Sequence, residues 1–179
     1  RIESYLLDLR FQARGALTPS DQLVQVALDQ ATIDREGRFP LDRSVLGGPL
    51  TTLGELGASQ IIIDMVFTEA GSEEEDAARL EALSSCEADI LAGYFLYTGA
   101  GDQPPVVEPD LVRSFEDRTM TVRPNGDLAG GQVLQAVGLH PPLPSVHEAA
   151  DDVGYLNLRV DRGGIVRRAQ LIMAHDGTI

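Results

Sequence analysis

The chain has 179 residues, a hydrophobic content of 43% and a formal net charge of −14. This length is typical of one domain with a substantial core, and the negative charge argues against binding to nucleic acid or an anionic membrane surface. All 14 basic residues are Arg, so no Lys is present to form a Schiff base or serve a phosphate-binding loop. The single Cys, Cys86, excludes an intrachain disulfide and a zinc site built from several Cys.

The N-terminal stretch predicts a long amphipathic helix over residues 2–14. Its apolar stripe is spaced by four, three and four residues: Ile2, Leu6, Leu9 and Ala13. Two heptads are too few to define a coiled coil, so packing of this helix on the domain core is the favoured role. The apolar run 23–28 then predicts a strand buried on both faces, followed by a short helix over 31–36.

Further elements alternate along the next part of the chain. A helix is predicted from Arg43 to about Gly57, a buried strand over 59–65, and a third strand over 90–97. Between these strands, Ser72 and Glu75 form a capping-box pattern that predicts a helix over residues 73–85. Because strands and helices alternate with short connections, parallel crossover units in an α/β sheet are expected.

The C-terminal part of the sequence predicts antiparallel pairing of strands in place of parallel pairing. Residues 99–143 have weak periodicity and many Gly and Pro, which favours a long irregular excursion, and 144–152 could form a helix. Residues 154–160 and 165–173 alternate apolar and polar side chains around the turn sequence DRGG, which predicts a β-hairpin. The predicted fold is α/β: a mixed, mostly parallel sheet with flanking helices, a long N-terminal helix and a C-terminal antiparallel hairpin.

Few motifs carry chemistry. The chain has no G-x-S-x-G and no G-x-G-x-x-G after its first predicted strand, and its three His lack metal-ligand spacing. Acids end two predicted strands, at Asp29 and Asp64, where ligands of open α/β sheets bind. Arg38 and Arg43 could return to the same edge. These groups could hold a cation, bind amine or hydroxyl groups of a ligand, or pair with each other.

Several segments, in this order, resemble a known family. They are YLLDLRFQARG at 5–15, VQVALDQATIDREGRFPLDR at 24–43, GASQIIIDMVFTE at 57–69, and LPSVHEAADDVGYLNLRVDRGGIVRRAQLI at 143–172. The sequence resembles the second family of CHASE domains (CHASE2), the cyclase- and histidine-kinase-associated extracellular sensing domains of bacteria. Residues 98–142 match it only loosely.

The resemblance implies an extracytoplasmic sensory domain of a cell-membrane receptor, with a nucleotide cyclase, histidine kinase or serine/threonine kinase as output. Residues 1–179 would be a single domain excised from a larger membrane protein and truncated at its C-terminal end, with membrane spans in the flanking sequence. The signal would be an unidentified small molecule or a stress, and a homodimer is possible. We expect the ligand-binding or switch residues to be Asp29, Arg38, Arg43, Asp64, Phe67, Asn157, Arg167 and Arg168.

Two alternatives remain open from the residues. The domain could be an assembly module that pairs protomers through the N-terminal helix and the hairpin edge and binds no ligand. Less favoured is an enzyme that uses Asp29 and Asp64 as a metal-binding or acid/base pair. For the sensor, no catalytic residue, cofactor or metal ligand is expected.

Overall fold

The structure is a computed structural model, and it describes residues 2–37, 43–99, 103–118, 133–161 and 163–175. The chain divides into two compact units. Unit 1 comprises Arg1–Leu41 and Val160–Arg168, and unit 2 comprises Asp42–Arg159 and Ala169–Ile179.

Unit 2 is built around the long strand β2 (Asp89–Tyr97). β1 (Gln60–Ile63) and β5 (Asp152–Tyr155) pair with it in parallel, one on each edge. The far half of β2 pairs antiparallel with β4 (Gly138–His140). A separate pair joins β3 (Leu134–Ala136) to β6 (Met173–His175), also in parallel. These pairings confirm the predicted mixed, mostly parallel sheet.

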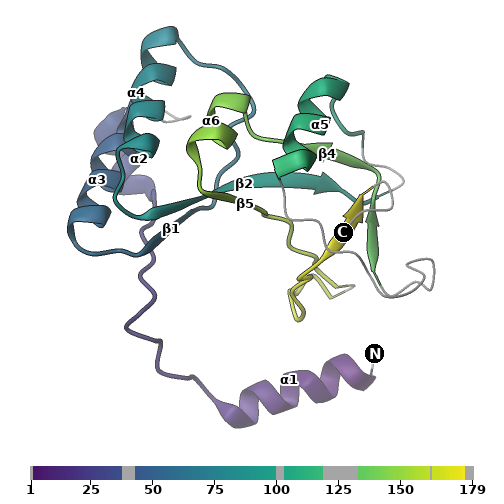
Figure 1. Cartoon of the computed structure of the whole chain (residues 1–179). Helices are drawn as coiled ribbons and strands as arrows, with labels where there is room; N and C mark the ends of the chain where they lie inside the picture. The colour runs from purple at the N-terminus through teal and green to yellow at the C-terminus, as the bar shows by residue number, and fades with distance from the viewer. Residues whose placement is uncertain (1, 38–42, 100–102, 119–132, 162, 176–179) are drawn as a thin grey trace. The chain divides into compact units, whose positions relative to one another are not determined.

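The helices of unit 2 lie on one face of the sheet (Figure 1). They are the 3-10 helix η1 (Arg43–Leu46), α3 (Gly47–Glu55), α4 (Glu73–Ser84), α5 (Pro109–Arg118) and α6 (Pro144–Ala149). The start of α4 is the predicted capping box. Glu75 donates its backbone N–H to the Ser72 hydroxyl (3.2 Å), and Ser72 donates its own to the Glu75 carboxylate (3.0 Å).

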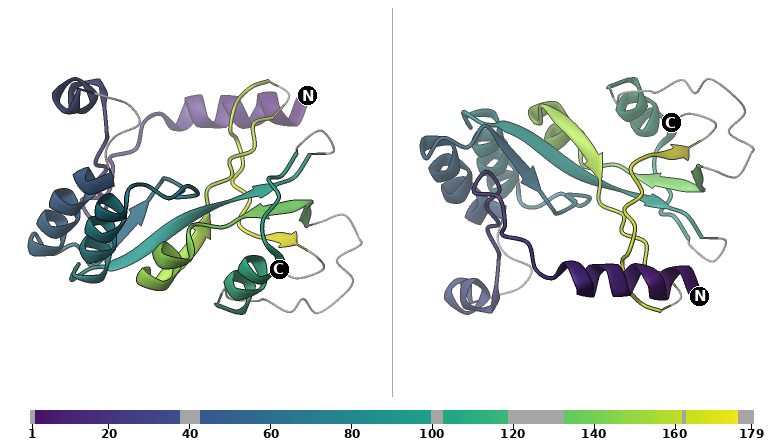
Figure 2. Two further views of the ribbon diagram at one scale, coloured as in Figure 1. Left: turned by 90° about the horizontal axis from the view of Figure 1, so that it is seen from above. Right: turned by 90° about the horizontal axis from the view of Figure 1, so that it is seen from below.

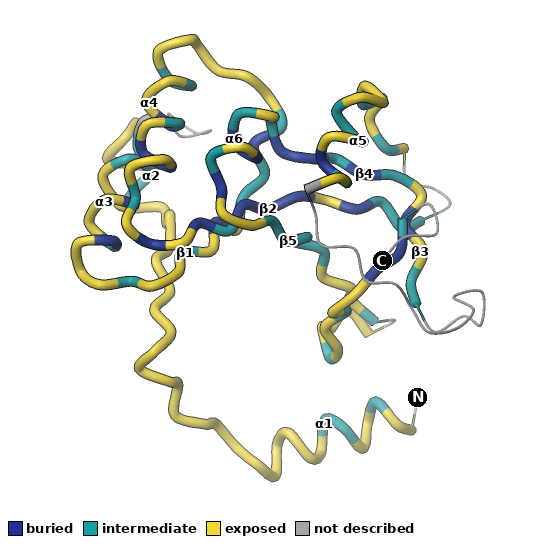
Figure 3. The backbone as a smooth tube through the Cα atoms, viewed as in Figure 1, coloured by how far each residue is buried: buried dark blue, intermediate teal, exposed yellow. Residues whose placement is uncertain are grey.

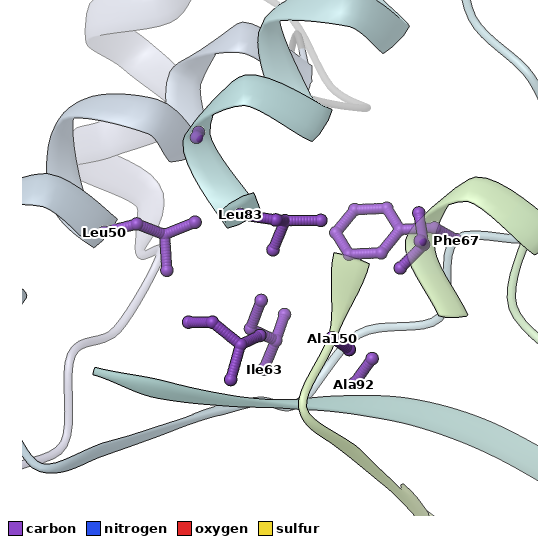
Figure 4. Close-up of a cluster of buried hydrophobic side chains, with 9 residues drawn as sticks. Leu50, Ile63, Phe67, Leu83, Ala92 and Ala150 are labelled. Atoms are coloured by element: carbon purple, nitrogen blue, oxygen red, sulfur yellow. The ribbon is translucent and has the colours of Figure 1, made fainter. Parts of the chain in front are cut away.

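The main core lies between the sheet and helices α3, α4 and α6 (Figure 4). Its buried members are Leu50, Ile63, Phe67, Ala82, Leu83, Ile90, Ala92, Val146 and Ala150. These side chains come from the apolar runs that predicted the strands and from one face of each helix. Burial of apolar surface from water therefore stabilises the layered arrangement.

A second cluster forms at the far end of β2. Tyr94 packs edge-to-face on Phe115 of α5, with ring centroids 4.9 Å apart. Burial raises the pKa of the Tyr94 phenol to about 12. The prediction that residues 99–143 are irregular is therefore wrong in part, because α5, β3 and β4 lie there. The missed signals were Pro109 at a helix start and the i, i+3 pair of Val112 and Phe115.

Unit 1 contains the predicted N-terminal helix, α1 (Ile2–Arg14), and α2 (Gln30–Glu36). No residue of α1 is buried, as Figure 3 shows by its colour. The predicted strand over 23–28 is wrong. That segment is extended but exposed, with Leu23 at 78% and Val24 at 75%. A strand needs a hydrogen-bonding neighbour, and the described part of unit 1 holds no other strand.

The predicted C-terminal hairpin also needs correction. Only its turn forms, with Asp161 donating its backbone N–H to the Ile165 carbonyl (3.0 Å). Neither arm pairs as an antiparallel strand in the described residues, since β5 and β6 both join parallel neighbours. Of the two predicted arms, only residues 154–155 and 173 lie in strands, and these strands pair with β2 and β3.

Candidate functional site

Asp29 is the N-cap of α2. Its carboxylate accepts hydrogen bonds from the backbone N–H of Thr32 (3.0 Å) and from the Thr32 hydroxyl (3.1 Å). These bonds hold the pKa of the Asp29 carboxyl below its usual value. A local helix-capping role thus accounts for an acid at this position.

Of the two arginines expected near Asp29, neither side chain can be placed. Arg38 lies outside the described residues. Arg43 begins η1, but its side chain is also outside the description. Their participation in a site stays a prediction.

Asp64 directly follows β1 and is exposed. Because β1 and β5 run parallel to β2, Asp64 lies at the carboxyl edge of the sheet, where α/β folds bind ligands. Phe67, three residues on, is a core residue at 8% exposure (Figure 4). Its backbone carbonyl accepts from Leu143 N–H (2.7 Å), so this part of the loop is held against the start of α6.

A buried arginine that the sequence reasoning missed stands over Phe67. The Arg79 guanidinium carbon lies 5.3 Å from the Phe67 ring centroid, and its Nη2 lies 2.9 Å from Oδ1 of Asp76. The side chain of Arg79 is fully buried. Cation–π and ion-pair contacts compensate its desolvation. The available signal was the Asp76–Arg79 spacing of i, i+3 in a predicted helix.

Asn157 lies two residues past β5, and its side chain extends the hydrogen bonding between β5 and β2 by binding the β2 backbone. Its Oδ1 accepts from the Leu96 N–H (2.8 Å), and its Nδ2 donates to the Leu96 carbonyl (2.6 Å). At the other end of β5, the Asp151 carboxylate accepts from Ile90 N–H (2.8 Å). Two polar side chains thus close both ends of the β2–β5 pairing.

Arg167 lies in a polar cluster within unit 1. Its Nε and Nη2 donate to the two carboxylate oxygens of Asp8 in α1 (2.6 and 2.7 Å), and its Nη1 donates to Asp161. The Arg167 side chain is only 12% exposed. We call Arg167, Asp8 and Asp161 the arginine clamp. Figure 2 shows α1 beside the turn that carries it.

Further contacts support the clamp on both sides. Asp161 also caps its own turn, accepting at Oδ1 from the Gly163 N–H (2.7 Å). Arg168 pairs with Glu3 of α1, with both side chains mostly exposed. The hydrogen bond from Arg167 lowers the pKa of Asp8, and the Gly163 N–H and Arg167 lower the pKa of Asp161. Both acids in turn raise the pKa of Arg167.

The structure therefore brings some of the predicted site residues into contact with the same element and places others in different units. Arg167 and Arg168 both engage acids of α1. Asp64 and Phe67 share one loop of unit 2. A joint site of Asp29 and Asp64 stays a prediction, since they belong to different units.

In the described ranges, no three His, Cys, Asp or Glu side chains are grouped so that they could hold a metal ion. Among the helices of the same residues, none has both the length and the apolar character needed to cross a bilayer.

The fold is therefore mixed α/β. Its N-terminal helix, α1, forms ion pairs with Arg167 and Arg168, which lie close to the C-terminal end of the sequence. A family model, the CHASE2 domain, matches residues 1–178. The chain belongs to the CHASE2 family, whose members are extracellular sensory domains of signalling receptors. This confirms the resemblance noted from the sequence. Comparisons with curated proteins and with solved structures gave no significant match.

Proposed function

We propose that this domain is the extracytoplasmic sensor of a bacterial transmembrane receptor. It passes a ligand- or stress-induced change to a cyclase, histidine kinase or serine/threonine kinase output domain. Membership of the CHASE2 family supports the sensory role. The observation that carries the mechanism is the arginine clamp, because it links α1 to a turn 159 residues away from Asp8 in sequence.

In this mechanism a ligand is recognised at the carboxyl edge of the sheet in unit 2. Asp64 is the exposed acid there, and its carboxylate suits an amine or hydroxyl group. A ligand shifts a conformational equilibrium only by binding one state more tightly than the other. The clamp then transmits the change, since movement of the 161–168 turn pulls directly on α1.

Ligand binding is tested by thermal melts of the 179-residue chain with panels of amino acids, sugars, small organic acids and divalent cations. A binder present at 100 times its Kd stabilises the fold by about 2.7 kcal/mol, which is several degrees for a domain of this size. The shift should disappear in Asp64→Asn. It should persist in Glu55→Gln, a matched exposed acid in α3. A shift that survives Asp64→Asn would remove Asp64 from the site.

Coupling is tested separately in the full-length receptor. Arg167→Gln should leave the ligand-induced melting shift intact and change the dependence of output activity on ligand. Arg159→Gln, which changes an exposed arginine eight residues earlier in the sequence, should leave that dependence unaltered. Normal signalling by Arg167→Gln would show that the clamp is structural and does not couple.

A further inference from the structure

The loop between β1 and α4, residues 64–72, begins with the exposed Asp64 and is held at two later points. Phe67 is buried in the main core, and its backbone carbonyl accepts a hydrogen bond from the N-cap residue of α6 (2.7 Å). Further along, the Gly71 N–H donates to both carboxylate oxygens of Asp76 in α4, at 3.0 and 3.1 Å. The path of the loop that carries Asp64 therefore depends on these two anchors, which lie with it in unit 2.

Both anchors meet at one buried side chain, that of Arg79. Its guanidinium carbon lies 5.3 Å from the ring centroid of Phe67. Its Nη2 lies 2.9 Å from Oδ1 of Asp76, the oxygen that also accepts from Gly71 at 3.0 Å. The Arg79 side chain is 0% exposed, and that of Asp76 is 24% exposed. One residue of α4 thus contacts the first anchor directly and the second through a single carboxylate.

The chemistry of this position suits an arginine. A planar guanidinium stacks on an aromatic ring and presents N–H groups to a carboxylate at the same time, which the compact ammonium of a lysine does less well. Burying a charge is costly, and an apolar side chain of similar length would fill the core without that cost. The charge of Arg79 is explained by what it fixes, namely the two anchors of the loop.

We propose that Arg79 is a positioning residue for the ligand site at Asp64. It holds the 64–72 loop in one path, so that the Asp64 carboxylate is ordered before a ligand arrives. A preorganised group binds more tightly, because less conformational freedom is lost on binding. The ligand-binding part rests on the proposed function, whereas the order of the loop is a property that can be measured without any ligand.

The first test measures the order of the loop in the 179-residue chain. Asp64→Cys in a Cys86→Ala background carries a nitroxide label, whose electron paramagnetic resonance line shape reports the mobility of residue 64. Arg79→Met should mobilise the label, because Met fills space but carries no charge. Arg79→Lys should mobilise it to a smaller degree, since an ammonium lacks the planar fork.

A matched control separates loop order from stability. Met173→Ala opens a cavity in the second cluster, away from the main core, and should leave the label as immobile as in the parent chain. Circular dichroism verifies that each variant folds, and Arg79→Lys decides the question if Arg79→Met does not. An unchanged line shape in the Arg79 variant that folds, or equal mobility in Met173→Ala, would overturn the proposal.

The second test measures recognition by calorimetry, with Asp64 intact. The probe is the compound of the melting panel that stabilises the wild-type chain most, at a temperature at which every variant is folded. Kd should rise about tenfold in Arg79→Met, a loss of about 1.4 kcal/mol, and stay unchanged in Met173→Ala. An equal rise in both variants would overturn the positioning role. A panel without any stabilising compound would contradict the proposed function instead, and the label mobility would still decide the role of Arg79.

Discussion

At the residue scale, Asn157 shows how a candidate ligand residue can serve the fold. Its amide offers one acceptor and donors, as a peptide unit does, and both are used on the backbone of Leu96. The sequence placed Asn157 among the expected ligand-binding residues, a role that stays a prediction. It could not indicate the partner, since Leu96 is 61 residues away.

Asn157→Ala should therefore destabilise the domain even without any ligand. Leu96 is buried, so its N–H and carbonyl would lose their partners, at a cost of about 1–3 kcal/mol. Urea unfolding measures this loss. Gln135→Ala, at an exposed position in β3, should change the free energy of unfolding little. Equal stability of the two variants would contradict the structural role of Asn157.

Gly93 is a second residue that cannot be replaced without a clash, because other parts of the chain pack closely against it. A Cβ there would lie 2.4 Å from Cδ1 of Leu156 and 2.9 Å from the Met65 carbonyl oxygen. Its partner across the β2–β5 ladder, Gly154, has no atom within 4 Å of the corresponding position. Two glycines paired in one ladder therefore differ in how much space surrounds them.

Gly93→Ala should destabilise the domain by about 1–3 kcal/mol, because the Met65 backbone cannot move as a side-chain tip can. Gly154→Ala should be tolerated. The melting temperatures of the two variants, measured by thermal denaturation, compare two positions within the same pair of strands. A larger loss in Gly154→Ala would contradict the packing described for the β2–β5 interface.

At the element scale, the stability of α2 distinguishes two roles for Asp29, as the N-cap of this helix or as a ligand-binding group. Asp29→Ala should increase hydrogen exchange of residues 30–36, because the Thr32 N–H loses its acceptor. Asp29→Ser retains a capping oxygen and should restore most of the protection. If ligand binding is lost in Asp29→Ser while α2 remains protected, Asp29 also has a role in recognition. Unchanged exchange in Asp29→Ala would contradict the cap.

The arginine clamp predicts a pH dependence for α1. Folding lowers the pKa values of Asp8 and Asp161 from 3.8, so the clamp contributes fully above that value. Its contribution is lost as pH falls below 3.8 through the lowered values. Exchange protection of α1, corrected for intrinsic rates, should be constant from pH 5 to 8 (roughly the range of greatest stability) and fall under stronger acid. Asp8→Asn should show low protection throughout; equal protection in this variant would exclude the clamp as the cause.

At the scale of the whole molecule, charge is the dominant long-range term. A net charge of −14 on 179 residues disfavours the compact state by self-repulsion. Raising ionic strength from about 0.01 to about 0.15 M shortens the Debye length from about 30 to about 8 Å and screens that repulsion. The melting temperature should therefore rise with salt. A fall would mean that attractive pairs such as Arg167–Asp8 outweigh the net repulsion, and Asp8→Asn would separate the two contributions.

The sequence by itself determined the features that depend on neighbouring residues. Ser72 and Glu75 define a helix start within four residues, and the apolar run that became β1 predicts a strand. The expectation that this strand is buried was wrong in part, because Ile63 is buried but Ile62 is 62% exposed. The order of such motifs also carried the family resemblance. Only the tertiary structure decided the partners: β5 pairs with β2 instead of forming a hairpin, Arg167 meets Asp8, and Arg79 is buried over Phe67. The physical reason is that extended chain has the same local pattern whichever neighbour it joins, and long-range partners leave no mark in local spacing.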